Sequence, residues 1–264
     1  IGLVGADSTG GDVAISLSGG AATIGSGSID TSGRASPGSD DTQEQSNDGF
    51  AGDVTLDITG GQHSFNSLSI LSGSNDASSF DDQGQLIAGA IRRSSTVLTV
   101  SGADTQLTID NDVNIDLSSS GAAVGVNDAM VSFIIRDGGA DGGLFVGDDI
   151  SINTSASNGS DTELNVAGLI DILVDDSQFS FDDLFADAVG SAGDFFFGGG
   201  AGNGRDYQGG EINITASNGG SISGDRVNLR SFASGVDATG GDGTGGDITV
   251  LADNSTIRLT GTLT

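Results

Sequence analysis

The sequence contains no cysteine, no tryptophan and no lysine, and it has one proline, one histidine and one methionine. Without cysteine no disulfide can form, so stability must come from packing and hydrogen bonding. A single histidine without cysteine excludes a zinc site built from several such ligands, and any Ser-His-Asp catalysis would depend on His63. We expect His63, in the polar stretch "GGQHSFN", to face solvent.

Aromatic and apolar residues are scarce. Hydrophobic residues make up 35% of the chain, below the roughly 45–50% of ordinary globular domains. The 46 glycines are the opposite extreme. A wide, layered core is hard to build from such a composition, so it favours a repetitive fold with a narrow core and many tight turns.

Positive charge is also scarce. Eight basic residues, all Arg, stand against 37 acidic residues, of which only three are Glu, and the net charge is −29. Aspartate favours turns and is a hard oxygen ligand, so the acidity indicates corners and surfaces. A chain this negative repels nucleic acid and anionic membranes, and it suits divalent cations or high salt. No apolar run is long enough to span a membrane.

A short motif recurs along the chain: Gly, an acid, a β-branched residue, a polar residue and an aliphatic one. It recurs six times, loosely, with its first β-branched position at Val13, Val54, Val113, Ile150, Ile212 and Ile248. In the third and fourth copies Asn111 and Asp148 replace the Gly. The steps between copies are 41, 59, 37, 62 and 36 residues. Most are close to multiples of about 20, in the range expected for solenoids.

Short runs of alternating aliphatic residues, such as Val113-x-Ile115-x-Leu117, predict strands with one buried face. A sandwich, antiparallel barrel or propeller would need hairpin turns and a wider aromatic core. We therefore predict an all-β, right-handed parallel β-helix (β-solenoid) over residues 1–264 as a single domain. Loop insertions are expected at about 31–52, 72–85 and 177–210. The stretch "DDLFADAV" at 182–189 is the one segment with helical character.

Residues 209–264, from "GGEINITASNGG" to "GGDITVLADNSTIRLTGTLT", resemble the repeats of filamentous-haemagglutinin-type bacterial surface proteins. Residues 10–60 share this resemblance, and 86–175 are similar in style to autotransporter passengers. The resemblance implies a right-handed β-helix, export by a type V or similar route, and a place outside the cell or on its surface. Such proteins are mostly adhesins, biofilm components or fibrous stalks. The absence of Lys and the excess of Asp depart from the family and suggest a saline source.

Enzymes with β-helix folds include polysaccharide hydrolases, which use paired carboxylates, and lyases, which use Arg or Lys as the base. Pairs of Asp are abundant here because Asp itself is. Basic residues that could grip a sugar are few: Arg92, Arg93, Arg136, Arg226 and Arg230. We therefore expect no catalytic residues. A lyase or hydrolase acting on extracellular polysaccharide is the alternative.

Calcium-binding repeats of the form G-G-x-G-x-D have two near matches, "GGAGNGRD" at 199–206 and "GGDGTGGD" at 240–247, and neither has the required spacing. A denser acidic cluster, Asp175, Asp176, Asp182 and Asp183, is the weak candidate for Ca²⁺. We expect no required cofactor, with Ca²⁺ as the one ion the sequence suggests.

Half of the twelve phenylalanines fall within 177–210: Phe179, Phe181, Phe185, Phe195, Phe196 and Phe197. They predict either a small core that holds a loop against the solenoid or a contact surface for a partner. Three consecutive Phe cannot all point inward on one strand.

Both ends of the chain have strand-like apolar residues, Ile1 and Leu3 at one end and Leu259 and Leu263 at the other. Solenoid ends normally carry caps. We therefore expect a segment or subunit of a longer rod. The sequence favours a non-catalytic extracellular structural or adhesive protein, a stiff acidic rod that is a head-to-tail filament or a biofilm or surface fibre. Its expected partners are further copies or flanking repeats, and cell-surface or extracellular polysaccharide.

Overall fold

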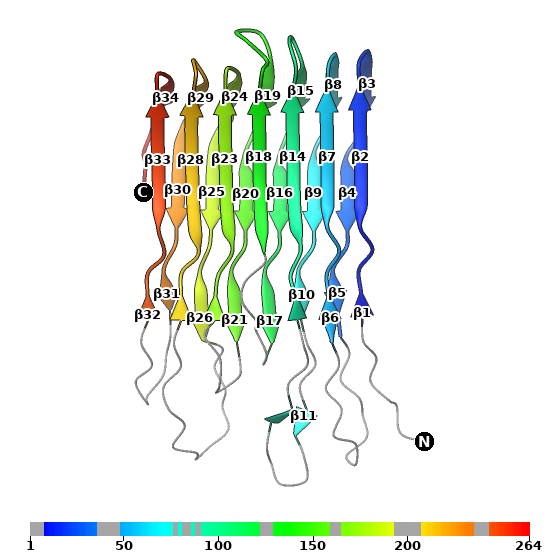
Figure 1. Cartoon of the computed structure of the whole chain (residues 1–264), viewed down its shortest axis with the longest axis vertical. Helices are drawn as coiled ribbons and strands as arrows, with labels where there is room; N and C mark the ends of the chain where they lie inside the picture. Colours follow the sequence, from blue (N-terminus) through cyan, green and yellow to red (C-terminus); the bar gives the residue numbers. More distant parts are fainter. Residues whose placement is uncertain are drawn as a thin grey trace.

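The computed structural model describes residues 8–35, 48–75, 79–80, 86–87, 91–121, 129–158, 165–192, 207–234 and 243–264. In these residues the chain winds into seven coils, and its strands stack in parallel on those of the neighbouring coils. In Figure 1 the chain runs up the near face, crosses to the far face and descends there while it advances from the N-terminal to the C-terminal end. This is a right-handed parallel β-helix, and it confirms the predicted fold class.

Three sheets run along the rod. Sheet 1 has one strand from each coil: β2 (Val13–Ser18), β7 (Val54–Thr59), β14 (Ser95–Ser101), β18 (Met130–Arg136), β23 (Leu169–Asp175), β28 (Glu211–Ser217) and β33 (Ile248–Asp253). Sheet 2 follows: β3 (Ala21–Ile24), β8 (Gln62–Phe65), β15 (Gln106–Ile109), β19 (Gly143–Val146), β24 (Gln178–Ser180), β29 (Ser221–Gly224) and β34 (Thr256–Leu259). Sheet 3 is β4 (Gly27–Asp30), β9 (Leu68–Leu71), β16 (Val113–Asp116), β20 (Ile150–Asn153), β25 (Asp183–Asp187) and β30 (Arg226–Arg230).

Beyond sheet 3 each coil narrows to a neck. One side of the neck is β5 (Gly33–Arg34), β10 (Ser74–Asn75), β17 (Ser119–Gly121), β21 (Ala156–Asn158), β26 (Gly190–Ala192) and β31 (Ala233–Ser234). The other side comprises β1 (Ser8–Thr9), β6 (Gly49–Phe50) and β13 (Ile91–Arg92), then β22 (Asn165–Val166), β27 (Tyr207–Gln208) and β32 (Gly243–Thr244). Outside the coils, β11 (Ser79–Phe80) pairs with β12 (Leu86–Ile87) in antiparallel fashion.

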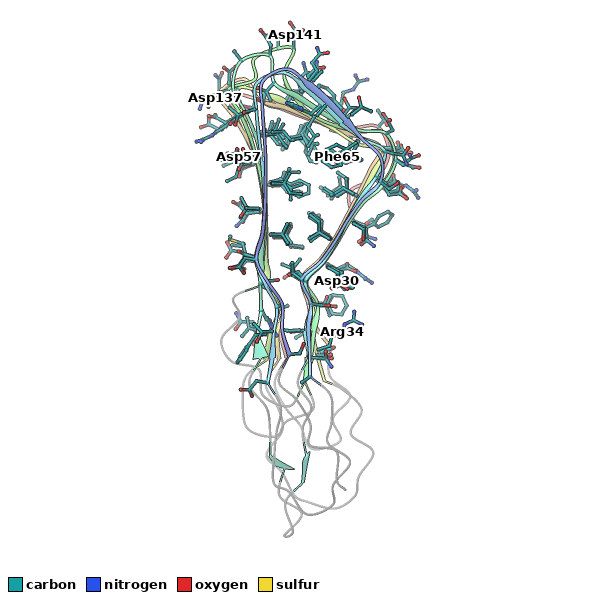
Figure 2. The ribbon with its side chains drawn as sticks, turned by 90° about the vertical axis from the view of Figure 1, so that its right-hand side faces the viewer. Asp30, Arg34, Asp57, Phe65, Asp137 and Asp141 are labelled. Carbon is teal, nitrogen blue, oxygen red and sulfur yellow. The ribbon has the colours of Figure 1, made fainter. Side chains whose placement is uncertain are left out.

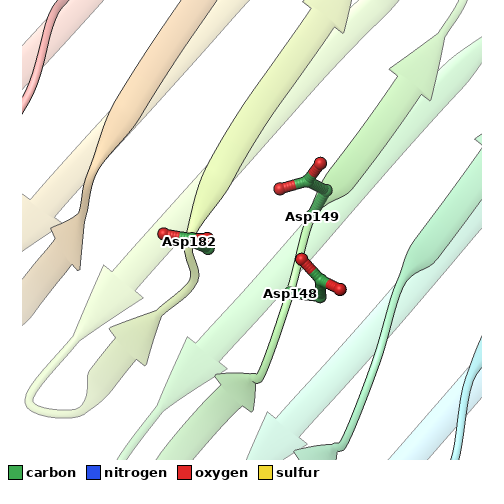
Figure 3. Close-up of side chains that lie close together, drawn as sticks. All are labelled: Asp148, Asp149 and Asp182. Carbon is green, nitrogen blue, oxygen red and sulfur yellow. The ribbon is translucent and has the colours of Figure 1, made fainter.

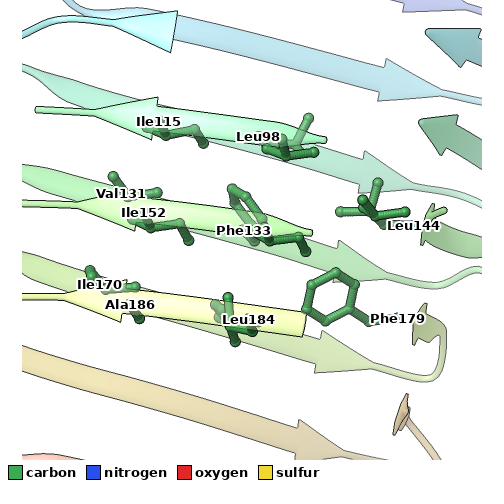
Figure 4. Close-up of a cluster of buried hydrophobic side chains, with 14 of the residues drawn as sticks. Leu98, Ile115, Val131, Phe133, Leu144, Ile152, Ile170, Phe179, Leu184 and Ala186 are labelled. Atoms are coloured by element: carbon green, nitrogen blue, oxygen red, sulfur yellow. The ribbon is translucent and has the colours of Figure 1, made fainter. Parts of the chain in front are cut away.

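The cross-section is a wedge. Figure 2 looks along the rod: sheets 1 and 3 converge on the neck, and sheet 2 closes the wide end. Inward side chains form ladders because parallel strands in register place like positions above one another. One ladder in sheet 1 contains Leu56, Leu98, Phe133, Ile172 and Ile214. Figure 4 shows part of this core, whose members are almost fully buried.

The glycine of the recurring motif is required by close approach between coils. A Cβ atom at Gly52 would lie 2.4 Å from the carbonyl oxygen of Gly11, and one at Gly210 would lie 1.9 Å from that of Gly168. The acid that follows the glycine caps the next coil. Asp12 Oδ1 accepts a hydrogen bond from the backbone N–H of Asp53 at 2.9 Å.

A second corner explains many of the other Gly, Asn and Asp residues. The residue directly after each strand of sheet 1 has a positive φ, between 46° and 100°: Gly19, Gly60, Gly102, Asp137, Asp176, Asn218 and Asn254. Only Gly adopts this left-handed conformation freely, and Asn and Asp tolerate it best among the others. The sharp turn from sheet 1 to sheet 2 therefore selects these three residue types in every coil.

The copies of the recurring motif do not all lie at the same place in a coil. Val113 and Ile150 begin strands of sheet 3, whereas the other four copies begin strands of sheet 1. In sheet 1, Val54 pairs with Thr96 and Thr96 with Val131, so a coil there spans 35 to 42 residues. The long steps of 59 and 62 residues thus combine a full coil with a move between two sheets.

Two expectations about residues 177–210 were wrong. The segment 182–189 is not helical: it contains β25, where Leu184 and Ala186 point inward beside Ile150 and Ile152. Strand pairing of β25 with β20 and β30 of the neighbouring coils overrides the local helical character. Strands β24, β25 and β26 belong to the solenoid, so no loop is inserted over 178–192. Residues 193–206 of the expected insertion, and 36–47 of the first one, lie outside the described residues. The 72–85 stretch includes β10 and β11.

Candidate functional site

The densest group of titratable side chains lies where sheet 2 turns into sheet 3. Pairing of Val113, Ile150, Leu184 and Val227 stacks the residues that precede these strands. We call this column the acidic corner: Asp112, Asp148, Asp149, Asp182, Asp183 and Asp225. Figure 3 shows Asp148 and Asp149 on one coil and Asp182 on its neighbour.

The carboxylates approach one another closely. Oxygen atoms of Asp148, Asp149 and Asp182 all lie within 4.8 Å, and so do those of Asp182, Asp183 and Asp225. Burial raises the pKa of Asp149 above its usual value, and the charges of Asp183 and other carboxylates of the corner raise it further. The corner is therefore a region of concentrated negative potential.

Arginine neutralises part of this charge. Arg226 Nε donates to Asp183 Oδ1 at 3.1 Å, and Arg226 Nη2 donates to Asp183 Oδ2. Arg230 makes the same bidentate contact with Asp187, four residues further along β30 and β25. The Asp183 side chain is 5% exposed. Because Arg226 already holds both oxygens of Asp183, a cation at this corner would rely on Asp148, Asp149, Asp182 and Asp225.

Such a ligand set has a definite chemical preference. All donors are carboxylate oxygens, which suit hard cations such as Ca²⁺ and Mg²⁺ rather than Zn²⁺. Ca²⁺ takes roughly six to eight oxygens, so two or three carboxylates would need water or backbone carbonyls to complete the shell. Exposed acidic groups of this kind are common without an ion.

The structure separates the four predicted metal ligands. Asp182 and Asp183 belong to the acidic corner, but Asp175 and Asp176 lie at the turn between sheets 1 and 2. There Asp175 Oδ1 accepts hydrogen bonds from Ser217 Oγ at 2.7 Å and Asn218 Nδ2 at 2.5 Å. Asp176 adopts a φ of 46° in the left-handed column. Both are explained by turn geometry, so closeness in sequence misled the prediction.

Sequence reasoning missed Asp112, Asp148, Asp149 and Asp225 as members of the corner. These residues lie one or two coils away from Asp182 in the chain, which no local pattern shows. The available signal was the Asp-Asp pair that precedes both Ile150 and Leu184.

The phenylalanines divide into two groups. Phe179 and Phe181 are 1% and 7% exposed and belong to the main core. The Phe179 ring meets Phe133 edge-on with centroids 6.2 Å apart, and it lies 5.0 Å from Phe181. These two are therefore not available to a partner. Phe185, on the outer side of β25, is 37% exposed. Phe195, Phe196 and Phe197 lie outside the described residues.

His63 does not face solvent as predicted. It is 4% exposed and points inward from β8, in register with Leu107. Its Nε2 lies 2.9 Å from the carbonyl oxygen of Gly60, so Nε2 carries the proton and donates it. His63 points inward because side chains alternate along a strand and its neighbours Gln62 and Ser64 point outward.

Three of the arginines considered for a lyase, Arg93, Arg226 and Arg230, bond to groups of this chain. Arg93 is 5% exposed, and its Nη1 donates at 2.7 Å to the carbonyl oxygen of Val166, which lies two coils further along the same side of the neck. Arg226 and Arg230 are paired with aspartates, as described above. The side chains of Arg136, Arg226 and Arg230 are 54%, 60% and 52% exposed.

A polar groove follows the concave angle between sheet 3 and the neck, near Arg34 in Figure 2. It has a volume of about 350 Å³, and serine lines most of it, from Ser74 to Ser191. Repeated short turns build its wall. Asp30 and Asp116 each accept a hydrogen bond at 3.0 Å from the backbone N–H two residues on. The groove offers hydroxyl groups and backbone polar groups rather than aromatic rings.

The chain matches no known family model, no curated protein and no solved structure. The resemblance to filamentous-haemagglutinin-type repeats therefore stays a prediction. Where the structure describes the chain, no helix is long and apolar enough to cross a membrane.

Proposed function

We propose that the protein is a non-catalytic extracellular structural or adhesive protein that works as a stiff acidic rod. The unbroken register of sheets 1 and 2 through seven coils supports this function. Each coil is hydrogen-bonded to the next at a spacing of about 4.8 Å, and bending the rod would strain all sheets at once.

Growth along the rod axis is the second part of the proposal. In the coil of β33 and β34, positions that are buried in other coils are open: Ile248 is 45% exposed, Val250 40% and Leu263 55%. Val250 and Leu263 border an apolar cavity of about 50 Å³ that also touches Phe181 and Leu259. A further coil stacked here would bury them, supplied either by a second copy or by flanking repeats of the same chain.

The first coil fits that role. Val13 and Ala21 begin β2 and β3 with the same separation as Ile248 and Thr256, which begin β33 and β34. A second copy could therefore extend sheets 1 and 2 in register. Such a head-to-tail contact does not close on itself, so it propagates into a filament.

The adhesive part of the proposal is supported by the serine-lined groove. Its hydroxyl and amide groups match the hydrogen-bonding chemistry of an extracellular polysaccharide, and its axis follows the rod. Surface-protein repeats, which the sequence resembles, have the same kind of role.

Electron microscopy at rising protein concentration tests the rod. We expect rods of constant width whose length increases with concentration. Particles of one fixed length at every concentration would contradict growth from this chain alone. Release of unsaturated sugars from acidic polysaccharides would contradict the non-catalytic role.

A further inference from the structure

The outer face of sheet 1 carries an apolar patch in a chain of net charge −29. The patch consists of Met130 and Ile134 on β18 and Leu169 and Leu173 on β23, and all four side chains point outward and are partly exposed. Met130 is in register with Leu169, and Ile134 with Leu173. The two strands are neighbours near the middle of the rod (Figure 1). Four large aliphatic side chains thus form a compact square on a flat surface.

The square matches itself under a two-fold rotation. Consider a second copy turned by 180° about an axis that runs parallel to the strands, between β18 and β23 and just above the sheet. This rotation places β18 of one copy over β23 of the other and leaves positions along the strand unchanged. Met130 then meets the partner's Leu169, and Ile134 meets the partner's Leu173. A two-fold interface needs this kind of self-complementary surface.

The polar residues of the same two strands match as well. Ser132 lies between Met130 and Ile134, and Asp171 occupies the equivalent position on β23. Ser132 is 5% exposed, and the rotation brings its largely covered hydroxyl opposite the partner's Asp171. Burial raises the pKa of Asp171, and the charge of Glu211 raises it further. A hydroxyl donor opposite this carboxylate would stabilise it.

The most specific match is between charges at the ends of the two strands. Arg136 ends β18 with a side chain that is 54% exposed, and its nearest carboxylate contact, with Asp137, is a loose 3.8 Å. Asp175 ends β23 at the equivalent position. The rotation places Arg136 opposite the partner's Asp175, and the symmetry generates this pair twice.

We propose that two copies of the chain associate face to face through the outer surface of sheet 1, with their rods antiparallel. The rotation lays six of the seven strands of sheet 1 over one another. Six strands of about six residues present a face of about 600 Å², somewhat below the roughly 800 Å² that one partner contributes to a standard interface. The proposal is independent of the proposed function, because coil-on-coil growth uses the ends of the rod and this contact uses its flank.

Charge exchange between chains tests the pairing. In Arg136→Asp homodimers both cross-pairs become Asp–Asp, and in Asp175→Arg homodimers both become Arg–Arg. We expect each variant alone to weaken dimerisation about tenfold or more in sedimentation velocity at physiological salt. An equimolar mixture restores both pairs in the heterodimer, so we expect it to recover the wild-type affinity. Effects within one chain cannot produce this recovery.

Two further variants complete the test. Leu173→Lys places a charge in the apolar square and should abolish the dimer, whereas Arg258→Asp, on the outer face of sheet 2, should leave it intact. Circular dichroism melts verify that each variant is folded. A wild-type chain that stays monomeric at high concentration and moderate salt would overturn the proposal. So would a mixture of Arg136→Asp and Asp175→Arg that dimerises no better than either variant alone.

Discussion

The carboxylate of Asp53 accepts a hydrogen bond from the backbone N–H of Ser95, one coil further along the chain, at 2.7 Å. The Ser95 hydroxyl donates to the same oxygen at 3.1 Å. The acid of the recurring motif therefore joins successive coils instead of only solvating its own turn.

We predict that Asp53→Ala lowers the free energy of unfolding by about 1–2 kcal/mol, because it removes a charge-assisted acceptor from a partly buried backbone donor. Chemical denaturation measures the loss. Asp57→Ala is the control: Asp57 is exposed on the adjoining strand and accepts only from Thr59 at 3.3 Å. The control should change stability by less than about 0.5 kcal/mol. Equal losses in both variants would show that the contact between coils has no special role.

Much of the fold could be predicted from sequence because the solenoid repeats a local rule. Alternation at Val113, Ile115 and Leu117 fixes which side chains face the core, and one buried face fixes the strand register. The Gly-acid motif marked real coil corners. It could not show which sheet each copy begins, since sheets 1 and 3 use similar corners.

The candidate site was harder to predict, because its members come together through stacking over long stretches of sequence. Asp149 and Asp183 precede Ile150 and Leu184, which are in register, yet the distance between them in the chain depends on the length of each neck and loop. Asp175 and Asp176 looked equivalent to Asp182 and Asp183 in sequence. Only the backbone conformation after β23 shows that Asp176 serves a turn.

That turn yields a second prediction, at Asp176. A β-branched residue is disfavoured at its φ of 46°, so Asp176→Val should destabilise the protein by roughly 1–2 kcal/mol. Asp176→Gly should be neutral or slightly stabilising, since Gly adopts this conformation without strain. Thermal melts of both variants, with and without Ca²⁺ and chelator, provide the measurement. A Ca²⁺ response that disappears in Asp176→Gly would instead make Asp176 a ligand.

The acidic corner yields a third prediction, on pH. The pKa of Asp149 is raised in the folded protein, mainly by burial, so the folded state binds this proton more tightly than the unfolded chain does. The corresponding stabilisation is fully present below the unfolded value of 3.8 and is lost as pH rises through the higher folded value. At neutral pH the ionised group therefore opposes folding.

Asp149→Asn should accordingly stabilise the protein at pH 7 and reduce the fall in stability that begins as pH rises above 3.8. Urea denaturation between that pH and pH 7 measures both effects. Asp141→Asn, on an exposed turn, is the control for the general loss of one negative charge. If both variants raise stability equally at pH 7, net charge is responsible and not the corner.

The fourth prediction concerns two glycines at equivalent positions of successive coils. A Cβ at Gly52 would meet the Gly11 carbonyl oxygen at 2.4 Å. The equivalent glycines of later coils, Gly168, Gly210 and Gly246, have similarly close atoms from the chain around them. Gly52→Ala should therefore lower the free energy of unfolding by about 3 kcal/mol or more. A Cβ at Gly11 has nothing within 4 Å, so Gly11→Ala should fold with unchanged stability. A second copy stacked on the first coil would bring its own backbone to that position, as Gly210 does for Gly246. Gly11→Ala should therefore leave the melting temperature unaltered and shorten the rods seen in electron micrographs. Rods of wild-type length would show that the first coil is not the surface on which the filament grows.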